Sequence, residues 1–135
     1  MLGPLLFLVF IDDIVHIIQN CQIRLFADDT CLFITVDNRA EAAEMINLDL
    51  ANIEDWSREW LVNFSAPKTK SLIISNKHYT HEHPRLFLHN QEIKEVSQHK
   101  HLCVTLSSNL RWNAHLDDVV SKCTKKLDMM RALKF

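Results

Sequence analysis

Glycine is almost absent from this 135-residue sequence. The single example, Gly3, lies beside Pro4 at the N-terminal end. A complete domain normally needs several glycines, because glycine most readily adopts the backbone conformations of tight turns. The scarcity indicates either a piece of a larger protein or a sequence that has drifted from its ancestor.

Closely spaced cysteines and long apolar runs are also missing. The four cysteines form no C-x-x-C pair and no dense framework, which predicts reduced thiols in an intracellular protein, nuclear or cytoplasmic. The apolar stretch 5–10 ends at Asp12 and Asp13, so it is too short to span a membrane. It also lacks the basic start and small-residue cleavage site of a secretory signal.

An excess of one charge sign is missing as well. The formal net charge is −2, with 47% hydrophobic and 24% charged residues, a balance typical of one globular domain. Residues 111–135 are locally basic, with six lysines or arginines against three aspartates. This end is compatible with contact to a nucleic-acid backbone, although a solvated helix face more often explains such a pattern.

The first half of the chain predicts a helix, a hairpin and a second helix. Pro4 suits the first turn of a mostly buried helix over residues 5–18. Branched and aromatic residues predict strands at 23–26 and 31–36, joined by a polar turn at 27–30.

A second helix is expected to begin after Asn38, a good N-cap, with Glu41 completing a capping-box pattern. Its apolar positions recur on one face. They are Ala42, Ile46, Leu50, Ile53 and Trp60.

The second half predicts short strands and a last helix. Strands are expected at 71–75, 86–88, 93–96 and 102–106, with a turn at 89–91. A helix over 113–133 carries an apolar stripe formed by Leu116, Val119, Val120, Cys123, Leu127 and Met130. This order of elements places the chain in the α+β class.

Asp28 and Asp29 form an acid pair at the tip of the expected hairpin. Their like charges repel, and a divalent cation relieves that repulsion. Carboxylates are preferred ligands of Mg²⁺, and two-metal phosphoryl transfer uses them to hold its ions. An ordinary acidic turn is the commoner explanation of a bare pair of aspartates.

The context of the pair resembles a known family. Phe26-Ala27-Asp28-Asp29-Thr30, followed by Leu32-Phe33, resembles the palm hairpin of reverse transcriptases, in particular those of non-LTR retrotransposons of the jockey type. Further segments resemble the same family in the same order: Leu2 to Phe7 running to Ile14, Trp60 to Asn63 with Lys68-Thr69-Lys70, Leu102 to Leu106, and Leu110-Arg111-Trp112 with His115.

The resemblance implies an RNA-directed DNA polymerase that uses Mg²⁺, deoxynucleoside triphosphates, an RNA template and a DNA primer. It implies that Asp28 is the essential metal ligand and that Asp29 contributes less directly. It also implies that Lys68 neutralises or protonates the leaving pyrophosphate, and that residues 102–106 position the primer end. A solvated lysine and a plain buried strand are the simpler explanations of the last two features.

The resemblance further implies a partial palm at 1–107, followed by a thumb-proximal helix at 108–135. In the family the first catalytic carboxylate precedes the segment that matches Gly3-Pro4. We therefore expect a fragment with an incomplete active site, which does not polymerise DNA alone and self-associates through exposed palm surface. Cys103 stands where the family usually has glycine.

Two other functions remain open. A remnant or co-opted palm could bind nucleic acid or a protein partner without catalysis. A different palm enzyme, such as a nucleotidyl cyclase, fits less well, because Lys68 and the 102–106 segment resemble polymerase features.

Three further groups of residues are expected to be structural. The acids Asp12 and Asp13 lie in a helix and point about 100° apart, which favours a solvent-facing role. Trp56 and Trp60 are expected to pack. The histidines match no zinc spacing, and loop histidines are usually solvated. These are His78, His81, His83, His89, His99 and His101.

Overall fold

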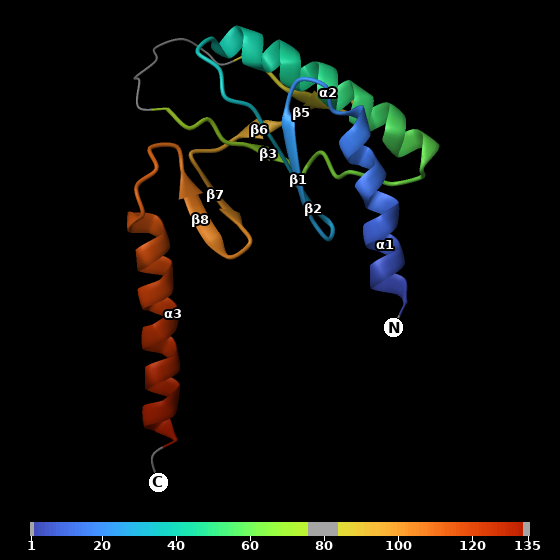
Figure 1. Cartoon of the computed structure of the whole chain (residues 1–135). Coiled ribbons are helices and arrows are strands. Elements are labelled where there is room, and N and C mark those ends of the chain that lie inside the picture. Colours follow the sequence, from blue (N-terminus) through green and yellow to red (C-terminus); the bar gives the residue numbers. More distant parts are fainter. Residues whose placement is uncertain (1, 76–83, 134–135) are drawn as a thin grey trace. The chain divides into compact units, whose positions relative to one another are not determined.

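The computed structural model describes residues 2–75 and 84–133 and confirms the α+β class (Figure 1). The described residues divide into two compact units. The first unit contains 2–69 with 84–93, and the second contains 70–75 with 94–133. The predicted boundary at residue 107 remains a prediction.

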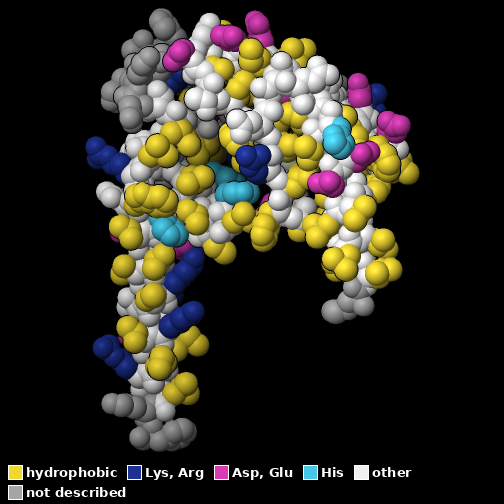
Figure 2. Space-filling view, in the orientation of Figure 1, with side chains coloured by type: hydrophobic (Ala, Val, Ile, Leu, Met, Phe, Trp, Pro, Cys, Tyr) yellow, Lys and Arg dark blue, Asp and Glu magenta, His cyan; other side chains and the backbone are white. Residues whose placement is uncertain are grey.

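The first unit begins with helix α1, Gly3–Asp12, which tightens into the 3₁₀ helix η1, Asp13–Ile17. The prediction of one continuous, mostly buried helix over residues 5–18 is therefore wrong. Of α1 only Ile11 is buried, whereas its other apolar side chains are largely exposed. Asp12 and Asp13 are exposed, as expected. Figure 2 shows the gathering of hydrophobic side chains over α1.

Strands β1, Gln22–Phe26, and β2, Asp29–Phe33, form the predicted antiparallel hairpin. Its loop contains only residues 27 and 28, because Phe26 pairs directly with Asp29. The second strand thus begins two residues earlier than expected and ends three residues earlier.

Helix α2, Arg39–Glu59, begins where the sequence predicts. The Asn38 side chain accepts a hydrogen bond from the Ala40 N–H at 3.0 Å and so caps the first turn. The buried face differs from the expected one. Trp60 is 38% exposed, and Asp49, Trp56 and Ser57 are buried instead.

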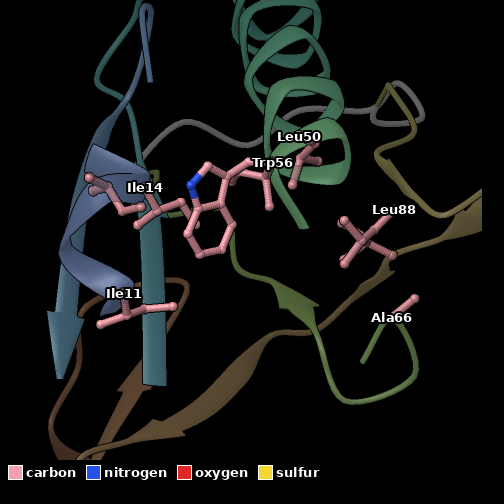
Figure 3. Close-up of a cluster of buried hydrophobic side chains, with 9 residues drawn as sticks. Ile11, Ile14, Leu50, Trp56, Ala66 and Leu88 are labelled. Carbon is pink, nitrogen blue, oxygen red and sulfur yellow. The ribbon is translucent and has the colours of Figure 1, made fainter. Parts of the chain in front are cut away.

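The core of the first unit forms between α2, η1 and the strands (Figure 3). Trp56 lies toward Ile11 and Ile14, while Leu50 lies nearer Leu88. The rings of Trp56 and Trp60 stack with centroids 6.1 Å apart, which confirms the packing role expected for this pair.

The side chain of Asp49 ties α2 to the segment that leads into β1. It is fully buried and accepts backbone hydrogen bonds from Gln19 at 3.1 Å, Asn20 at 3.0 Å and Cys21 at 2.7 Å. One turn further along α2, the Asn52 amide donates to the Ile17 carbonyl at 3.2 Å. The start of the hairpin is therefore fixed by polar side chains of α2.

The opposite flank of α2 holds a second hairpin in the same way. Strands β4, Phe87–Leu88, and β5, Gln91–Glu92, are antiparallel. The Asn47 side chain donates to the Arg85 carbonyl and accepts from the Phe87 N–H, and Glu54 accepts from the His89 N–H.

The second unit contains very short strands. Strand β3, Lys70–Ser71, pairs in parallel with β6, Lys94–Glu95, and β7, Gln98–His101, pairs antiparallel with β8, Val104–Ser107. The strand expected at 71–75 is therefore mostly wrong. The one expected at 102–106 is wrong at its start, because residues 102 and 103 form the turn.

Helix α3, Asn113–Ala132, matches the last predicted helix to within a residue. Its described residues include no buried side chain. The predicted apolar stripe is present, but within this unit it remains exposed (Figure 2).

We predict that Asp49→Asn lowers the free energy of unfolding by about 2–4 kcal/mol, because hydrogen bonds to a buried charge are lost. Burial alone would raise the pKa of Asp49, but the backbone hydrogen bonds from Gln19, Cys21 and Asn20 outweigh it and lower the pKa. Its stabilisation is therefore complete above the ordinary carboxyl pKa, about 3.9, and is lost as the pH falls through the lowered value.

Urea unfolding at neutral and acidic pH measures this effect. Asp55→Asn is the matched control on the same helix, because the Asp55 side chain is 74% exposed and pairs only with Arg58 among the described residues. It should cost less than about 1 kcal/mol. Equal losses in the two variants would contradict the role given to Asp49.

Candidate metal-binding hairpin

The acid pair occupies the tightest part of the β1–β2 hairpin. Asp28 is the second of the two loop residues, and Asp29 is the first residue of β2. Ala27, the first loop residue, has a φ of 52°. Two-residue hairpin loops need a positive φ at this position, and glycine usually supplies it. Here alanine adopts it, at a strain cost of about 1–2 kcal/mol.

The two faces of the hairpin differ in burial. Ile23 and Leu25 both lie on the face that contributes to the core. Asp29 pairs with Phe26 and so shares the opposite, exposed face with Arg24. The Arg24 guanidinium lies over the Phe33 ring at 5.6 Å on this face. The packed face thus fixes the hairpin while the acidic tip remains in solvent.

Both carboxylates are available to a ligand. Asp28 and Asp29 are exposed, and the described residues provide no hydrogen bond or ion pair to either side chain. Carboxylate oxygens are hard ligands of the kind that Mg²⁺ prefers. Within residues 2–75 and 84–133 no third histidine, cysteine or acid joins them to form a closed metal site.

Lys68 lies in a turn that follows α2. Its backbone N–H donates to the Ser65 carbonyl at 3.1 Å, and the Thr69 hydroxyl donates to the same carbonyl at 3.0 Å. The lysine side chain is exposed. No described contact joins it to Asp28 or Asp29, so its chemical role remains a prediction. A shallow hollow of about 340 Å³ adjoins the turn, lined by Asn63, Phe64, Ser65, Ala66, Pro67, His89 and Gln91.

The segment expected to position a primer end lies in the second unit. Leu102 and Cys103 form the two-residue loop of the β7–β8 hairpin, with φ angles of 46° and 69°. Positive φ at both loop positions strongly favours glycine or asparagine. This gives a physical reason for a glycine at the position of Cys103 in the family that the sequence resembles.

The histidines divide between described and undescribed residues. His78, His81 and His83 lie outside the described residues. His89 has Nδ1 at 3.9 Å from Glu54 Oε2, and its Nε2 is buried without a partner in the described structure. His89 and Asn90 form the β4–β5 loop, which confirms the predicted turn.

Asp49 is the residue that sequence reasoning missed. It lies three positions after Ile46 and directly before Leu50, within the apolar face of α2. An acid inside an apolar stripe is a signal that its charge is satisfied by specific donors, since buried charges must be paired. The pKa of the Cys21 thiol is raised to about 12, first by its burial and then by its hydrogen bond with Asp49 and the negative charge of Asp49.

Comparison with curated proteins finds three similar polymerases of Drosophila melanogaster. The chain is 25% identical to the probable RNA-directed DNA polymerase from transposon BS, over 98% of this chain and 15% of that protein. It is 25% identical to the corresponding protein from transposon X-element, over 93% of this chain and 14% of that protein. It is 24% identical to the RNA-directed DNA polymerase from mobile element jockey, over 96% of this chain and 15% of that protein.

These matches confirm the resemblance to jockey-type polymerases that the motifs indicate. The chain spans about 15% of the length of the first of these relatives. No family model and no solved structure matches it. No helix among the described residues is long and apolar enough to cross a membrane.

We predict that Ala27→Gly raises the free energy of unfolding by up to about 1 kcal/mol, because glycine adopts the positive φ of residue 27 without strain. The same substitution at Ala51, an exposed position inside α2, should lower it by about 1 kcal/mol. Chemical denaturation of the two variants gives both values. Destabilisation by Ala27→Gly as large as that by Ala51→Gly would contradict the hairpin geometry.

Proposed function

We propose that this chain is part of an RNA-directed DNA polymerase of the jockey type and contributes two acids to its nucleotidyl-transfer site. The observation that carries the proposal is the acid pair at the exposed loop of a two-stranded hairpin. The resemblance to three such polymerases over more than nine-tenths of the chain supports it.

In the proposed reaction Asp28 and Asp29 hold Mg²⁺, with Asp28 as the main ligand. The bound ion would neutralise triphosphate charge and lower the cost of deprotonating the primer hydroxyl. The Lys68 ammonium would protonate or neutralise the leaving pyrophosphate. The exposed positions of all three side chains are compatible with approach of a deoxynucleoside triphosphate.

The remaining elements would serve the two nucleic-acid strands. We assign residues 1–107 to a partial palm, with the β7–β8 hairpin near the primer end. Residues 108–135 would start a thumb. The basic residues of α3 would approach the phosphates of the RNA template and DNA primer. Those within the described helix are Lys122, Lys125, Lys126 and Arg131.

Two carboxylates bind Mg²⁺ weakly, and the two-ion reaction uses a further acid. We therefore propose that activity needs a carboxylate from polypeptide beyond these 135 residues. The exposed apolar side chains of α1 favour its cover by further protein, because a helix that is apolar all round is normally buried. Leu5 is 61% exposed and Val9 76%.

The second candidate function is a non-catalytic palm that binds nucleic acid or a protein partner. The small number of ligands at the hairpin favours it, because two exposed acids alone do not make a closed site. This candidate predicts binding without dependence on Asp28.

Primer extension on an RNA template with Mg²⁺ tests the polymerase proposal. The 135-residue chain alone should give no product, because alignment of the primer hydroxyl and charge neutralisation would be incomplete. A chimera, in which this chain replaces the matching segment of the transposon BS polymerase, should extend the primer. In that chimera Asp28→Asn should lower the rate by about 10³-fold.

Asp55→Asn provides the matched control, since it is an exposed aspartate of α2 away from the loop. Its chimera should retain the parental rate. If the isolated chain extends the primer and Asp28→Asn abolishes that extension, the site is already complete in these 135 residues. An active chimera that tolerates Asp28→Asn would refute the assigned metal ligand.

We also predict that the 135-residue chain self-associates through the apolar surface of α1. Leu5→Lys with Val9→Lys should shift the protein toward monomer in sedimentation velocity. Leu48→Lys, at a 60% exposed position on α2, should not. A wild-type chain that is monomeric at every concentration tested would contradict this prediction.

A further inference from the structure

Polar side-chain contacts join the start of helix α3 to the β7–β8 hairpin. None of its described side chains is buried. Near its first turns, His115 contacts β8 and Asp118 contacts β7. A helix held in this way can change its orientation when a single polar contact is lost, because no apolar core resists the movement.

The His115 contact satisfies an open strand edge. The loop of residues 102 and 103 makes His101 and Val104 the first hydrogen-bonded pair of the hairpin, so the next pair, Lys100 and Thr105, is not hydrogen-bonded. The Thr105 N–H therefore points away from β7. It donates to Nδ1 of His115 at 3.3 Å.

This bond requires one particular protonation state of the ring. An imidazole nitrogen accepts a hydrogen bond only when it carries no proton, so the contact requires a neutral ring with its proton on Nε2. The ring is also fixed from the side by Trp112, with centroids 5.9 Å apart and planes at 65°. A protonated ring would present an N–H to the Thr105 N–H and lose the bond.

We propose that His115 is a positioning residue whose neutral imidazole fixes α3 against strand β8, and that protonation of this ring releases the helix. This would set the direction of α3 relative to the hairpin by pH. The inference does not depend on polymerase activity, because it concerns only contacts within the second unit.

The other charged groups near His115 do not change charge over the range in which histidines titrate. Asp118 accepts hydrogen bonds from Lys122 at 2.6 Å and from Lys100 at 3.0 Å, and these lower its pKa. The Lys122 pKa is raised by the same contact. Arg111 stays protonated, as arginine does in proteins.

The remaining titratable groups nearby are side chains of the hairpin. His99 and His101 on β7 are half-buried, and Cys103 is exposed in the loop. Substitution of His99 and His101 by glutamine removes their titration and leaves His115 as the imidazole of the described second unit that can respond to pH.

Two measurements on the full chain test the proposal. The first is the hydrogen-exchange protection of the Thr105 amide at about pH 8 and about pH 5, corrected for the intrinsic exchange rate. The second is the distance between spin labels on Cys103 and Cys123, which are both exposed, with Cys21 and Cys31 replaced by serine.

Acidification should lower the Thr105 protection by about 3–10-fold, the loss expected for one hydrogen bond, and should broaden the label distances. The His99→Gln, His101→Gln variant should behave in the same way. His115→Phe keeps a ring beside Trp112 but provides no acceptor, so it should show the acidic behaviour at both pH values. His115→Asn provides an acceptor that does not titrate, so it should remove the pH dependence.

Three results would overturn the proposal. The first is a Thr105 amide that is equally protected at both pH values in the wild-type chain. The second is a pH response that disappears with His99 and His101 but not with His115. The third is a His115→Phe variant that keeps the wild-type protection and label distances at about pH 8. If His115→Phe unfolds the second unit, the comparison of His115→Asn with wild type still decides the outcome.

Discussion

The buried carboxylate of Asp49 is the interaction on which the candidate site depends. Its two oxygens satisfy three consecutive backbone N–H groups between η1 and β1, and Asn20 adds a side-chain bond at 3.1 Å. Because β1 begins one residue after Cys21, this contact determines where the hairpin starts. The position of Asp28 and Asp29 follows from that start and from the register of the strands.

Helix α2 organises the first unit through both kinds of interaction. Leu50, Ile53 and Trp56 supply its apolar contacts. On either side of them, Asp49 with Asn52, and Asn47 with Glu54, bind backbone groups of two different segments. Polar contacts of this kind have defined geometry, so they specify position where apolar packing alone would allow sliding.

The scarcity of glycine has a measurable structural consequence. Seven residues other than glycine adopt positive φ angles in the described structure. Five of them lie in the loops of the three two-residue hairpins, one lies in the segment before α3, and one follows α2. In the same order, they are Ala27, His89, Asn90, Leu102, Cys103, Leu110 and Leu61. Strain of this kind costs roughly 1–2 kcal/mol at a residue other than asparagine, and glycine would avoid it.

The elements with strong local signals could be predicted from the sequence. The hairpin follows from branched and aromatic residues that flank polar ones, α2 begins at the cap of Asn38, and α3 follows the apolar periodicity after residue 113. The position of Asp49 within the apolar face of α2 signals its burial, but the donors that satisfy it could not be predicted, because they lie about 30 residues away in sequence. The exposure of α1 was also missed, since periodicity shows that a helix is apolar but not what covers it.

The candidate site was predicted only in part, because local sequence patterns do not encode tertiary contacts. Local sequence places Asp28 and Asp29 at a hairpin loop, and the structure agrees. The relation of Lys68 to that loop depends on tertiary contacts that no local pattern encodes. The two-residue strands β3 to β6 also depend on long-range pairing, which explains why their predicted bounds were less accurate.

Paramagnetic broadening by Mn²⁺ tests the central claim, that the hairpin loop is a metal-binding site, most directly. In the amide spectrum of the 135-residue chain, Mn²⁺ should selectively broaden residues 26–30, Mg²⁺ should reverse the effect, and Asp28→Asn should abolish it. Broadening that is centred on Asp12 and Asp13 instead, or that persists unchanged in Asp28→Asn, would contradict the claim.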